Sequence, residues 1–307
     1  MSTPQAVVHR VASTATDWLA GSREFFSAPT DIPEVEWDVD TVLKPLVELA
    51  LAASFVLREG VAGTRQIRAC RELLECSWRW LRHGEVLYRV QIQEPAATYP
   101  LEFYSVFAAT GRRHRGLDGL LRHVRGTRSP AAQELMPTRE LAVLRAWRDA
   151  GFAPYDEPTR VAARTWLGRT PEPWTIDTTA AYAVTHAVFH LTDLGRAPQA
   201  MPPPLRDYLD SWLPVWCEVW AEAEDWDLLG ELLIVDLCLP QPHVPPRIWQ
   251  RYADAQRPDG LMPRGGSPAP QTAREDFVDH YHSTVVAVLA GTLALSRDIE
   301  GGVHEPC

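Results

Sequence analysis

The sequence has few cysteines, a single lysine and no long apolar run, and these shortages argue against several classes of protein. Five cysteines in 307 residues, an odd number without a C-x-x-C pair, argue against a disulfide scaffold and favour a reducing cytoplasm. No stretch reaches the roughly 18 uninterrupted apolar residues of a membrane span, and the N-terminus lacks the apolar core of a signal peptide. We therefore expect a soluble, cytoplasmic protein without a membrane partner.

The charge balance is acidic and argues against a nucleic-acid partner. Thirty Lys and Arg residues face forty Asp and Glu residues, which leaves a net charge of −10. Such a chain repels a phosphate backbone. Lys44 is the only lysine, and this preference for arginine is typical of a GC-rich genome and favours an actinobacterial origin.

Patterns of β-strands are nearly absent, so the sequence predicts an all-α protein. Only residues 87–92 look extended, while Pro and Gly clusters separate about twelve segments with helical periodicity. The expected helices span residues 5–26, 40–59, 64–84, 99–112, 115–126, 137–151, 157–168, 177–194, 203–223, 226–238, 246–257 and 274–297.

These segments alternate between largely apolar and amphipathic composition. A helix that is apolar on all faces is buried, and a helix with a charged stripe lies outside. The alternation predicts a single domain over residues 1–307, with inner helices around a central cavity and outer helices that cover them. Residues 1–35 are expected at its periphery. An open solenoid of helix pairs is the structural alternative.

Residues 253–291 contain the turn Gln256-x-x-Asp259-Gly260, followed by an expected inner helix that carries H-Y-H at 280–282. This segment resembles the hairpin repeat of α/α-toroid enzymes, an architecture shared by squalene-cyclase-type terpene cyclases, protein prenyltransferase β-subunits and lanthionine cyclases. The resemblance implies an (α/α)6 toroid with inner and outer rings, and it supports the fold more than a reaction.

The T-H-x-x-F-x-L-T-D-x-G motif at residues 185–195 resembles a motif of actinobacterial proteins of similar length. The sequence also departs from well-known toroid enzymes. The nearest match to a D-x-D-D acid motif is D-V-D-T at 38–41, and neither a D-D-x-x-D magnesium motif nor a zinc pattern of Cys and His occurs. These departures disfavour standard terpene cyclisation, prenyl transfer and thioether formation.

His186, His190 and Asp193 share one helical face, because they are spaced by four and three residues. Two imidazoles and a carboxylate at this spacing can bind one divalent metal ion as a cofactor. The alternative is structural: His186 packs in the interior, and His190 and Asp193 form an ion pair at the end of the helix.

His282 is the second candidate for catalysis, with Asp279 three residues before it on the same face. A carboxylate that orients a histidine raises its basicity, as a general acid or base near pH 7 requires. His280 points about 100° away and is the poorer candidate. The acids at the start of this helix are equally explained as favourable charges at a helix N-terminus.

In a ring, the same ends of all inner helices meet at one rim, so distant segments converge there. The expected substrate-binding side chains at this rim are Tyr182, Tyr281, Tyr104 and Glu102. The rim also gathers further acids near helix starts, among them Asp225, Asp227 and Glu231, and these are explained equally well as helix caps.

Together these patterns favour an enzyme of actinobacterial specialised metabolism that acts on a small or peptide substrate in a central cavity. Its chemistry would be cyclisation, isomerisation or elimination, with His186 and His282 as general acid and base. A metal-dependent form of this prediction adds His190 and Asp193 as ligands. The alternative is a non-catalytic helical ring that binds a peptide or protein partner.

Overall fold

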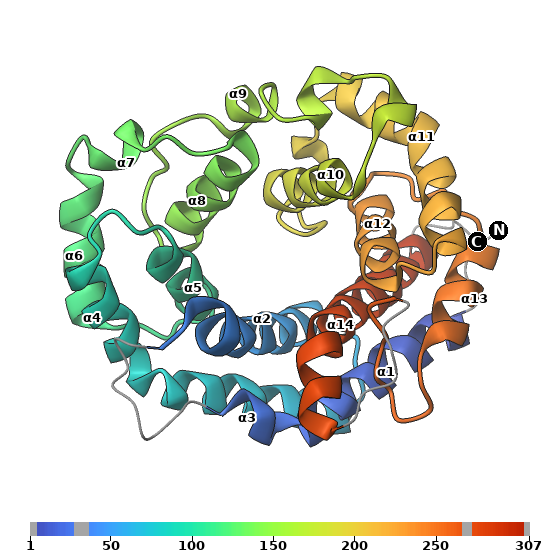
Figure 1. The fold of residues 1–307 in the computed structure, drawn as a ribbon, viewed down its shortest axis with the longest axis horizontal. Helices are drawn as coiled ribbons and strands as arrows, with labels where there is room; N and C mark the ends of the chain where they lie inside the picture. Colours follow the sequence, from blue (N-terminus) through green and yellow to red (C-terminus); the bar gives the residue numbers. More distant parts are fainter. Residues whose placement is uncertain (1–4, 28–36, 266–271, 304–307) are drawn as a thin grey trace.

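The α-helices of the computed structural model lie in two concentric layers around a central opening (Figure 1). The structure describes residues 5–27, 37–265 and 272–303. No strand occurs among these residues, so the all-α prediction is confirmed. Cys307 and residues 266–271 of the segment 253–291 lie outside the described residues, as do 1–4 and 28–35 of the expected peripheral segment.

In the described part of the chain, six helices form the inner layer, and each contacts the next around the circle. The last of them, α14, also contacts the first, α2, so the inner layer is closed. The inner helices are α2 (Lys44–Glu59), α5 (Tyr99–Ala108), α8 (Pro137–Asp149), α10 (Thr178–Thr192), α12 (Trp226–Cys238) and α14 (Ala273–Val303).

The remaining helices cover the inner layer from outside. They are α1 (Gln5–Gly21), α3 (Thr64–Trp80), α4 (Glu85–Gln93), α6 (Arg115–Arg125), α7 (Ser129–Ala132), α9 (Pro158–Ala162), α11 (Pro203–Glu222) and α13 (Pro246–Ala255). Short 3-10 turns lie at Arg23–Phe26, Arg82–Gly84, Leu167–Arg169, Pro173–Thr175 and Pro198–Ala200, and a π turn lies at Val39–Leu43.

The first helix of the chain packs along the last one and joins the two ends of the fold. At Gly291 a β-carbon would lie 2.8 Å from the backbone nitrogen of Ala12. A side chain at this position would push α1 away from α14. Glycine is therefore required for this close approach of two helices.

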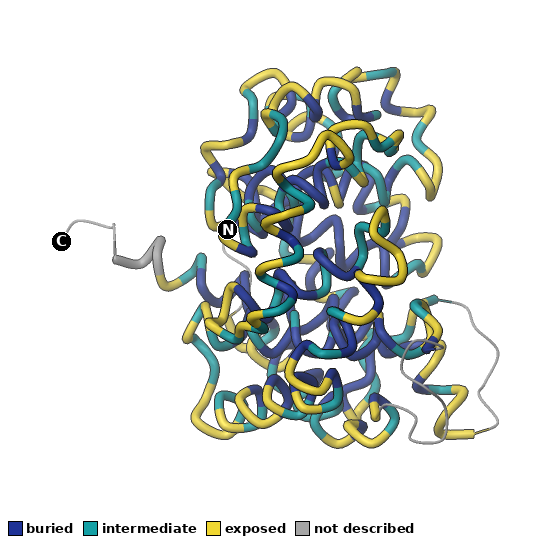
Figure 2. The backbone as a smooth tube through the Cα atoms, turned by 90° about the vertical axis from the view of Figure 1, so that its left-hand side faces the viewer, coloured by how far each residue is buried: buried dark blue, intermediate teal, exposed yellow. Residues whose placement is uncertain are grey.

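Burial follows the alternation that the sequence predicts. In α12 every residue from Asp227 to Cys238 is buried, whereas outer helices such as α6 bury only one stripe. Figure 2 shows buried backbone in the interior and exposed backbone at the turns and outer faces. None of the described helices combines the length and apolarity needed to cross a membrane.

Capping side chains start two of the inner helices that carry the site described below. The side chain of Asp177 accepts a hydrogen bond from the backbone amide of Ala180 at the start of α10. Asp225 does the same for Leu228 at the start of α12. Each bond satisfies an amide that has no partner within its helix.

One local prediction is wrong: residues 87–92 are helical and belong to α4. Val86, Leu87 and Val90 are buried, and their spacing matches one face of a helix rather than one face of a strand. Apolar residues in so short a run fit both patterns, and packing of α4 against its neighbours selects the helix.

Candidate functional site

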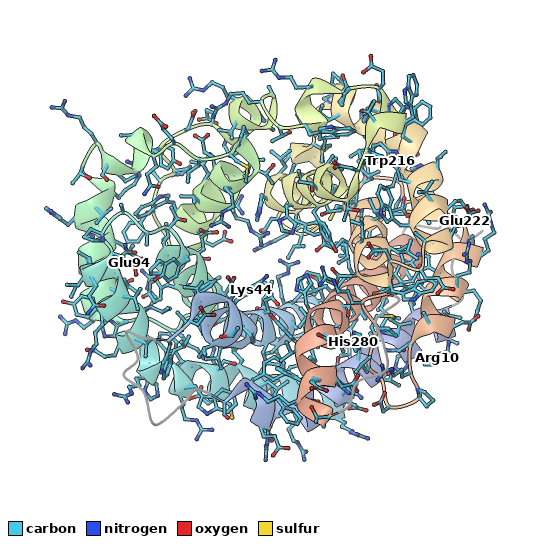
Figure 3. All side chains as sticks on the ribbon, in the orientation of Figure 1. Arg10, Lys44, Glu94, Trp216, Glu222 and His280 are labelled. Atoms are coloured by element: carbon cyan, nitrogen blue, oxygen red, sulfur yellow. The ribbon has the colours of Figure 1, made fainter. Side chains whose placement is uncertain are left out.

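The inner helices enclose a cavity of about 750 Å³. All six contribute side chains to its lining. Figure 3 shows Lys44 on the inner face of the ring, while Trp216, Glu222 and Arg10 lie in the outer layer. Apolar side chains such as Phe55, Phe189 and Leu289 line part of the cavity, and charged side chains line the rest.

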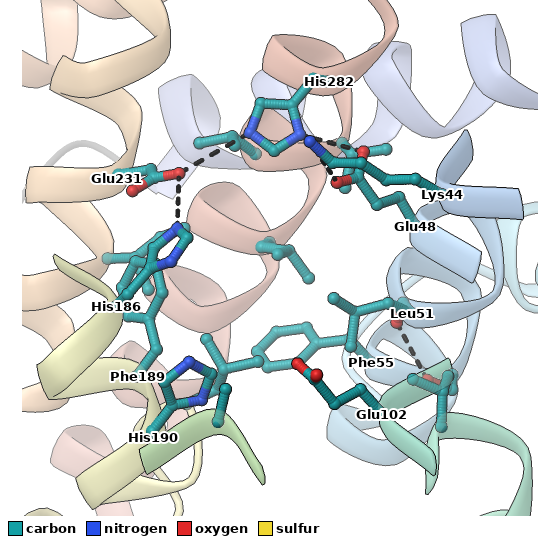
Figure 4. Close-up of a pocket in the computed structure, with 18 of the residues that line it drawn as sticks. Lys44, Glu48, Leu51, Phe55, Glu102, His186, Phe189, His190, Glu231 and His282 are labelled. Atoms are coloured by element: carbon teal, nitrogen blue, oxygen red, sulfur yellow. Dashed lines mark hydrogen bonds and ion pairs between the residues drawn. The ribbon is translucent and has the colours of Figure 1, made fainter. Parts of the chain in front are cut away.

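Glu231 lies at the centre of a polar cluster in this cavity (Figure 4). Its Oε1 is 3.7 Å from Nε2 of His186. The same oxygen is 3.7 Å from Nε2 of His282. Nε2 of His282 is also 3.8 Å from Oδ1 of Asp227. Side chains from α10, α12 and α14 thus meet at one point.

The far sides of His282, Asp227 and Glu231 are each held by a further contact. Nδ1 of His282 lies 3.0 Å from Oε2 of Glu48. The hydroxyl of Tyr182 donates to Oδ2 of Asp227 at 2.6 Å. The hydroxyl of Thr185 donates to Oε2 of Glu231. Because these bonds fix the outer atoms, the inner atoms face one another.

Burial and neighbouring charge act in opposite directions on these groups. Burial would raise the pKa of Glu231, but the imidazoles of His186 and His282 outweigh it and the pKa is lowered. Burial raises the pKa of Asp227. For His282, burial alone would lower the pKa, but Glu48, Glu231 and Asp227 raise it well above its usual value. Each charge in the cluster depends on its neighbours.

Three members of the cluster have the spacing of a metal-ligand set. Asp227, Glu231 and His282 each offer one ligand atom, and these atoms all lie within 4.8 Å of one another. No second group of this kind, made of at least three His, Cys, Asp or Glu side chains, is found in the described part of the chain.

A second charged cluster lines the cavity around Asp193. Oδ1 of Asp193 lies 2.7 Å from Nη2 of Arg145 and 3.8 Å from Nη1 of Arg58. Arg145 also donates to the carbonyl oxygen of Phe189 at 3.1 Å. These bonds secure the C-terminal end of α10, where carbonyl groups have no partner within the helix.

His190 lies beside this second cluster and lines the cavity. Burial lowers the pKa of His190 well below its usual value, and the charges of Arg145 and His186 lower it further. Its buried Nδ1 has no hydrogen-bond partner among the described residues. The ring is therefore uncharged near neutral pH.

The predicted pair His186 and His282 is brought together, since both histidines face the same oxygen of Glu231. The predicted metal ligands His186, His190 and Asp193 are not brought together at one point, because His186 faces Glu231 and Asp193 pairs with Arg145. Side chains on one helical face diverge here because neighbouring helices offer them different partners.

The role predicted for Asp279 belongs to another residue. Asp279 is exposed at the edge of the cavity, and the carboxylate that contacts Nδ1 of His282 is Glu48. His280 points away from the cavity as predicted, because its Nδ1 accepts a hydrogen bond from the backbone amide of Arg264.

Of the predicted substrate-binding residues, Tyr182, Tyr281 and Glu102 line the cavity. Glu102 is also paired with Arg139 at 2.6 Å. The prediction for Tyr104 is wrong. Its side chain is fully buried behind the inner layer, and its hydroxyl donates to Asp118 at 2.6 Å.

Sequence reasoning placed Asp227 and Glu231 among the acids that converge at the rim but gave them no individual role, and it gave Glu48 no role. A signal was present. Asp227 and Glu231 are spaced by four residues in a largely apolar helix, and Glu48 interrupts an apolar run. Acids are rarely buried without a partner, so acids in helices predicted to be buried indicate a site.

The fold and site define an all-α protein whose described helices enclose a buried cluster of carboxylates and imidazoles. The chain belongs to the family described as "Domain of unknown function (DUF6895)", whose model matches residues 12–292. That range includes every residue of the Glu231 cluster. Comparisons with curated proteins and with solved structures gave no match.

Proposed function

We propose that this protein is an enzyme of actinobacterial specialised metabolism that transfers a proton within a small or peptide substrate held in the central cavity. The observation that carries the proposal is the convergence of His186 and His282 on one buried oxygen of Glu231. Isomerisation, cyclisation and elimination are the reactions that fit such a site.

The cluster is more than a structural device. Asp227 and Glu231 are only 3% and 2% exposed. Burying carboxylates costs solvation energy, and apolar residues of similar size would often stabilise a fold equally well. Charged side chains placed on a cavity wall are typical of binding and catalytic sites.

His186 is the group placed to exchange a proton with the substrate, because its side chain is 49% exposed while Glu231 behind it is buried. With Nε2 turned towards Glu231, Nδ1 is the ring nitrogen left for the substrate. In an isomerisation, the lone pair of Nδ1 removes a proton, and the imidazolium returns it to another atom of the same substrate. The carboxylate of Glu231 stabilises the imidazolium in between.

The rest of the cavity would bind the body of the substrate. Its volume of about 750 Å³ suits a small molecule or a short peptide. Phe55, Phe189 and Leu289 offer apolar contacts. Tyr182 and Tyr281 lie beside the polar cluster, where they can orient the reacting group.

Turnover in a metabolite extract tests the proposal. Purified protein is incubated with an extract of an actinobacterium, and untargeted mass spectrometry follows which compounds are consumed and formed. The wild type is expected to convert at least one compound into an isomer or an elimination product. His186→Ala should lose this conversion while its melting temperature stays close to that of the wild type.

His123→Ala is the matched control, because His123 is exposed on α6, in the outer layer. It should convert the same compounds as the wild type. Conversion by His186→Ala at the wild-type rate would contradict the assignment. Compounds retained by the protein but never converted would instead favour a binding protein, the alternative that the sequence left open.

A further inference from the structure

We infer that Asp227, Glu231 and His282 bind a divalent transition-metal ion at the wall of the cavity. The ion would lie at the proposed reaction centre, and its part in catalysis rests on the proposed function. The binding of the ion does not rest on the proposed function, because binding is measured without turnover. The ligand set differs from the one that the motif at residues 185–195 predicts.

The distances from His282 to the two carboxylates are those of ligands that share an ion. Nε2 of His282 is 3.7 Å from Oε1 of Glu231 and 3.8 Å from Oδ1 of Asp227. Both separations are too long for a hydrogen bond. Ligand atoms that each lie about 2.1 Å from one metal ion are about 3–4 Å apart.

Each proposed ligand is also oriented by a second contact on its far side. Glu48 contacts Nδ1 of His282, Tyr182 donates to Asp227, and Thr185 donates to Glu231. Metal-binding histidines and carboxylates in proteins are held in this way, which fixes the ring orientation and aims the free atom at the ion. Here all three contacts leave the inner atom directed at a common point.

One of these inner atoms lacks a hydrogen bond. Oδ1 of Asp227 is buried, the residue is only 3% exposed, and this oxygen has no hydrogen-bond partner among the described residues. Buried carboxylate oxygens are normally satisfied. The carboxylates of Glu48, Asp227 and Glu231 surround the imidazole of His282, and a bound cation would supply the partner that Oδ1 of Asp227 lacks.

The donor set selects the kind of ion. One imidazole nitrogen, which releases its proton to the solvent when the ion binds, and two carboxylate oxygens suit Zn²⁺, Mn²⁺ or Fe²⁺, whereas Mg²⁺ and Ca²⁺ prefer oxygen ligands alone. The cluster lines the cavity, so a substrate atom or water can reach a remaining position on the ion. His186 faces the same oxygen of Glu231 and would lie beside the ion.

Zn²⁺ titration of the full chain tests the inference. The protein is dialysed against a chelator, and Zn²⁺ binding is followed by isothermal titration calorimetry, with bound zinc measured by mass spectrometry. The wild type should bind one equivalent. Glu231→Gln and Asp227→Asn should lose this binding. Tyr182→Phe should weaken it 10–100-fold, as expected for loss of a contact that orients a metal ligand.

Asp149→Asn is the matched control, because Asp149 is an acid of α8 that lines the same cavity, pairs with Arg145 and Arg148, and is not a proposed ligand. It should bind zinc like the wild type. Circular dichroism verifies that each variant is folded, and Tyr182→Phe, which keeps every proposed ligand, serves where a ligand variant does not fold. Absence of zinc binding by the wild type, or equal binding by folded Glu231→Gln, would overturn the inference.

The two proposals can fail separately. If the protein binds no zinc but converts a compound, and this conversion depends on His186, the metal site is refuted and the proposed enzyme activity is supported. If the wild type binds one equivalent of zinc, Glu231→Gln loses this binding and no compound is converted in extracts, the metal site is supported and the proposed reaction is refuted.

Discussion

Nδ1 of His282 lies 3.0 Å from Oε2 of Glu48, although the two residues are 234 positions apart in the chain. Glu48 belongs to α2 and His282 to α14, the helices that close the inner layer. The contact that closes the ring is therefore also part of the candidate site. We therefore expect changes at this pair to affect both the stability of the fold and the proposed site.

Removal of this contact should destabilise the fold. In a double-mutant cycle with Glu48→Gln and His282→Gln, we expect a coupling energy of about 1.5–3 kcal/mol, the range for a hydrogen bond to a charged group. Urea unfolding measures it. The control cycle pairs Glu48→Gln with His186→Gln, whose imidazole faces Glu231 instead, and should give a smaller coupling. Equal couplings in the two cycles would show that the contact is unimportant.

Gly230 should not tolerate a side chain, because α12 is packed tightly against its neighbours. A β-carbon at Gly230 would lie 2.4 Å from the hydroxyl of Tyr252 and 2.7 Å from Cγ1 of Val286. We expect Gly230→Ala to lower the free energy of unfolding by about 1–3 kcal/mol. Thermal denaturation measures the loss.

Tyr252→Phe should restore part of that stability when combined with Gly230→Ala. The substitution removes the hydroxyl that the new methyl group would overlap, and this hydroxyl has no hydrogen-bond partner among the described residues. A double variant that is no more stable than additivity predicts would argue against this overlap.

His190 should make the protein sensitive to acid. Burial, Arg145 and His186 lower its pKa in the folded state, and Arg139 and Arg148 add to the effect. The unfolded chain binds a proton below about pH 6.5, and the folded state does not. Stability is therefore lost as the pH falls through this value, by up to about 2 kcal/mol at pH 5.

His190→Gln carries no titratable ring and should lose less stability than the wild type between pH 7.5 and pH 5. Urea unfolding at both pH values gives the comparison. His123→Gln, at an exposed position, should follow the wild type. If His190→Gln and the wild type lose equal stability, His190 is not held in its neutral form.

Tyr104→Phe should affect stability without affecting the site. The hydroxyl of Tyr104 donates to Asp118 at 2.6 Å and accepts from the backbone amide of His114 at 2.9 Å. Its loss should cost about 1–2 kcal/mol. Zinc binding and conversion in extracts should remain at wild-type levels. A loss of either at unchanged stability would restore Tyr104 to the substrate-binding group.

Part of the site was accessible from local spacing. The separation of 280 from 282 on a helix sends His280 away from His282, and the structure agrees. Spacing on one helix failed for His190 and Asp193, because α8 and α2 supply Arg145 and Arg58 as partners for Asp193. The spacing along one helix predicts which of its own side chains are neighbours, but it does not predict which side chains of other helices lie opposite them.

The spacing of apolar residues and the positions of Pro, Gly and capping residues are enough to predict a helical protein with buried and exposed helices. An apolar stripe and a capping side chain each act within one helix. The packing of α2, α10, α12 and α14 side by side decides the rest. It makes Glu48, and not Asp279, the partner of His282, and it places Glu231 between His186 and His282. Contacts between residues far apart in the chain depend on how whole helices pack, and no local pattern encodes that geometry.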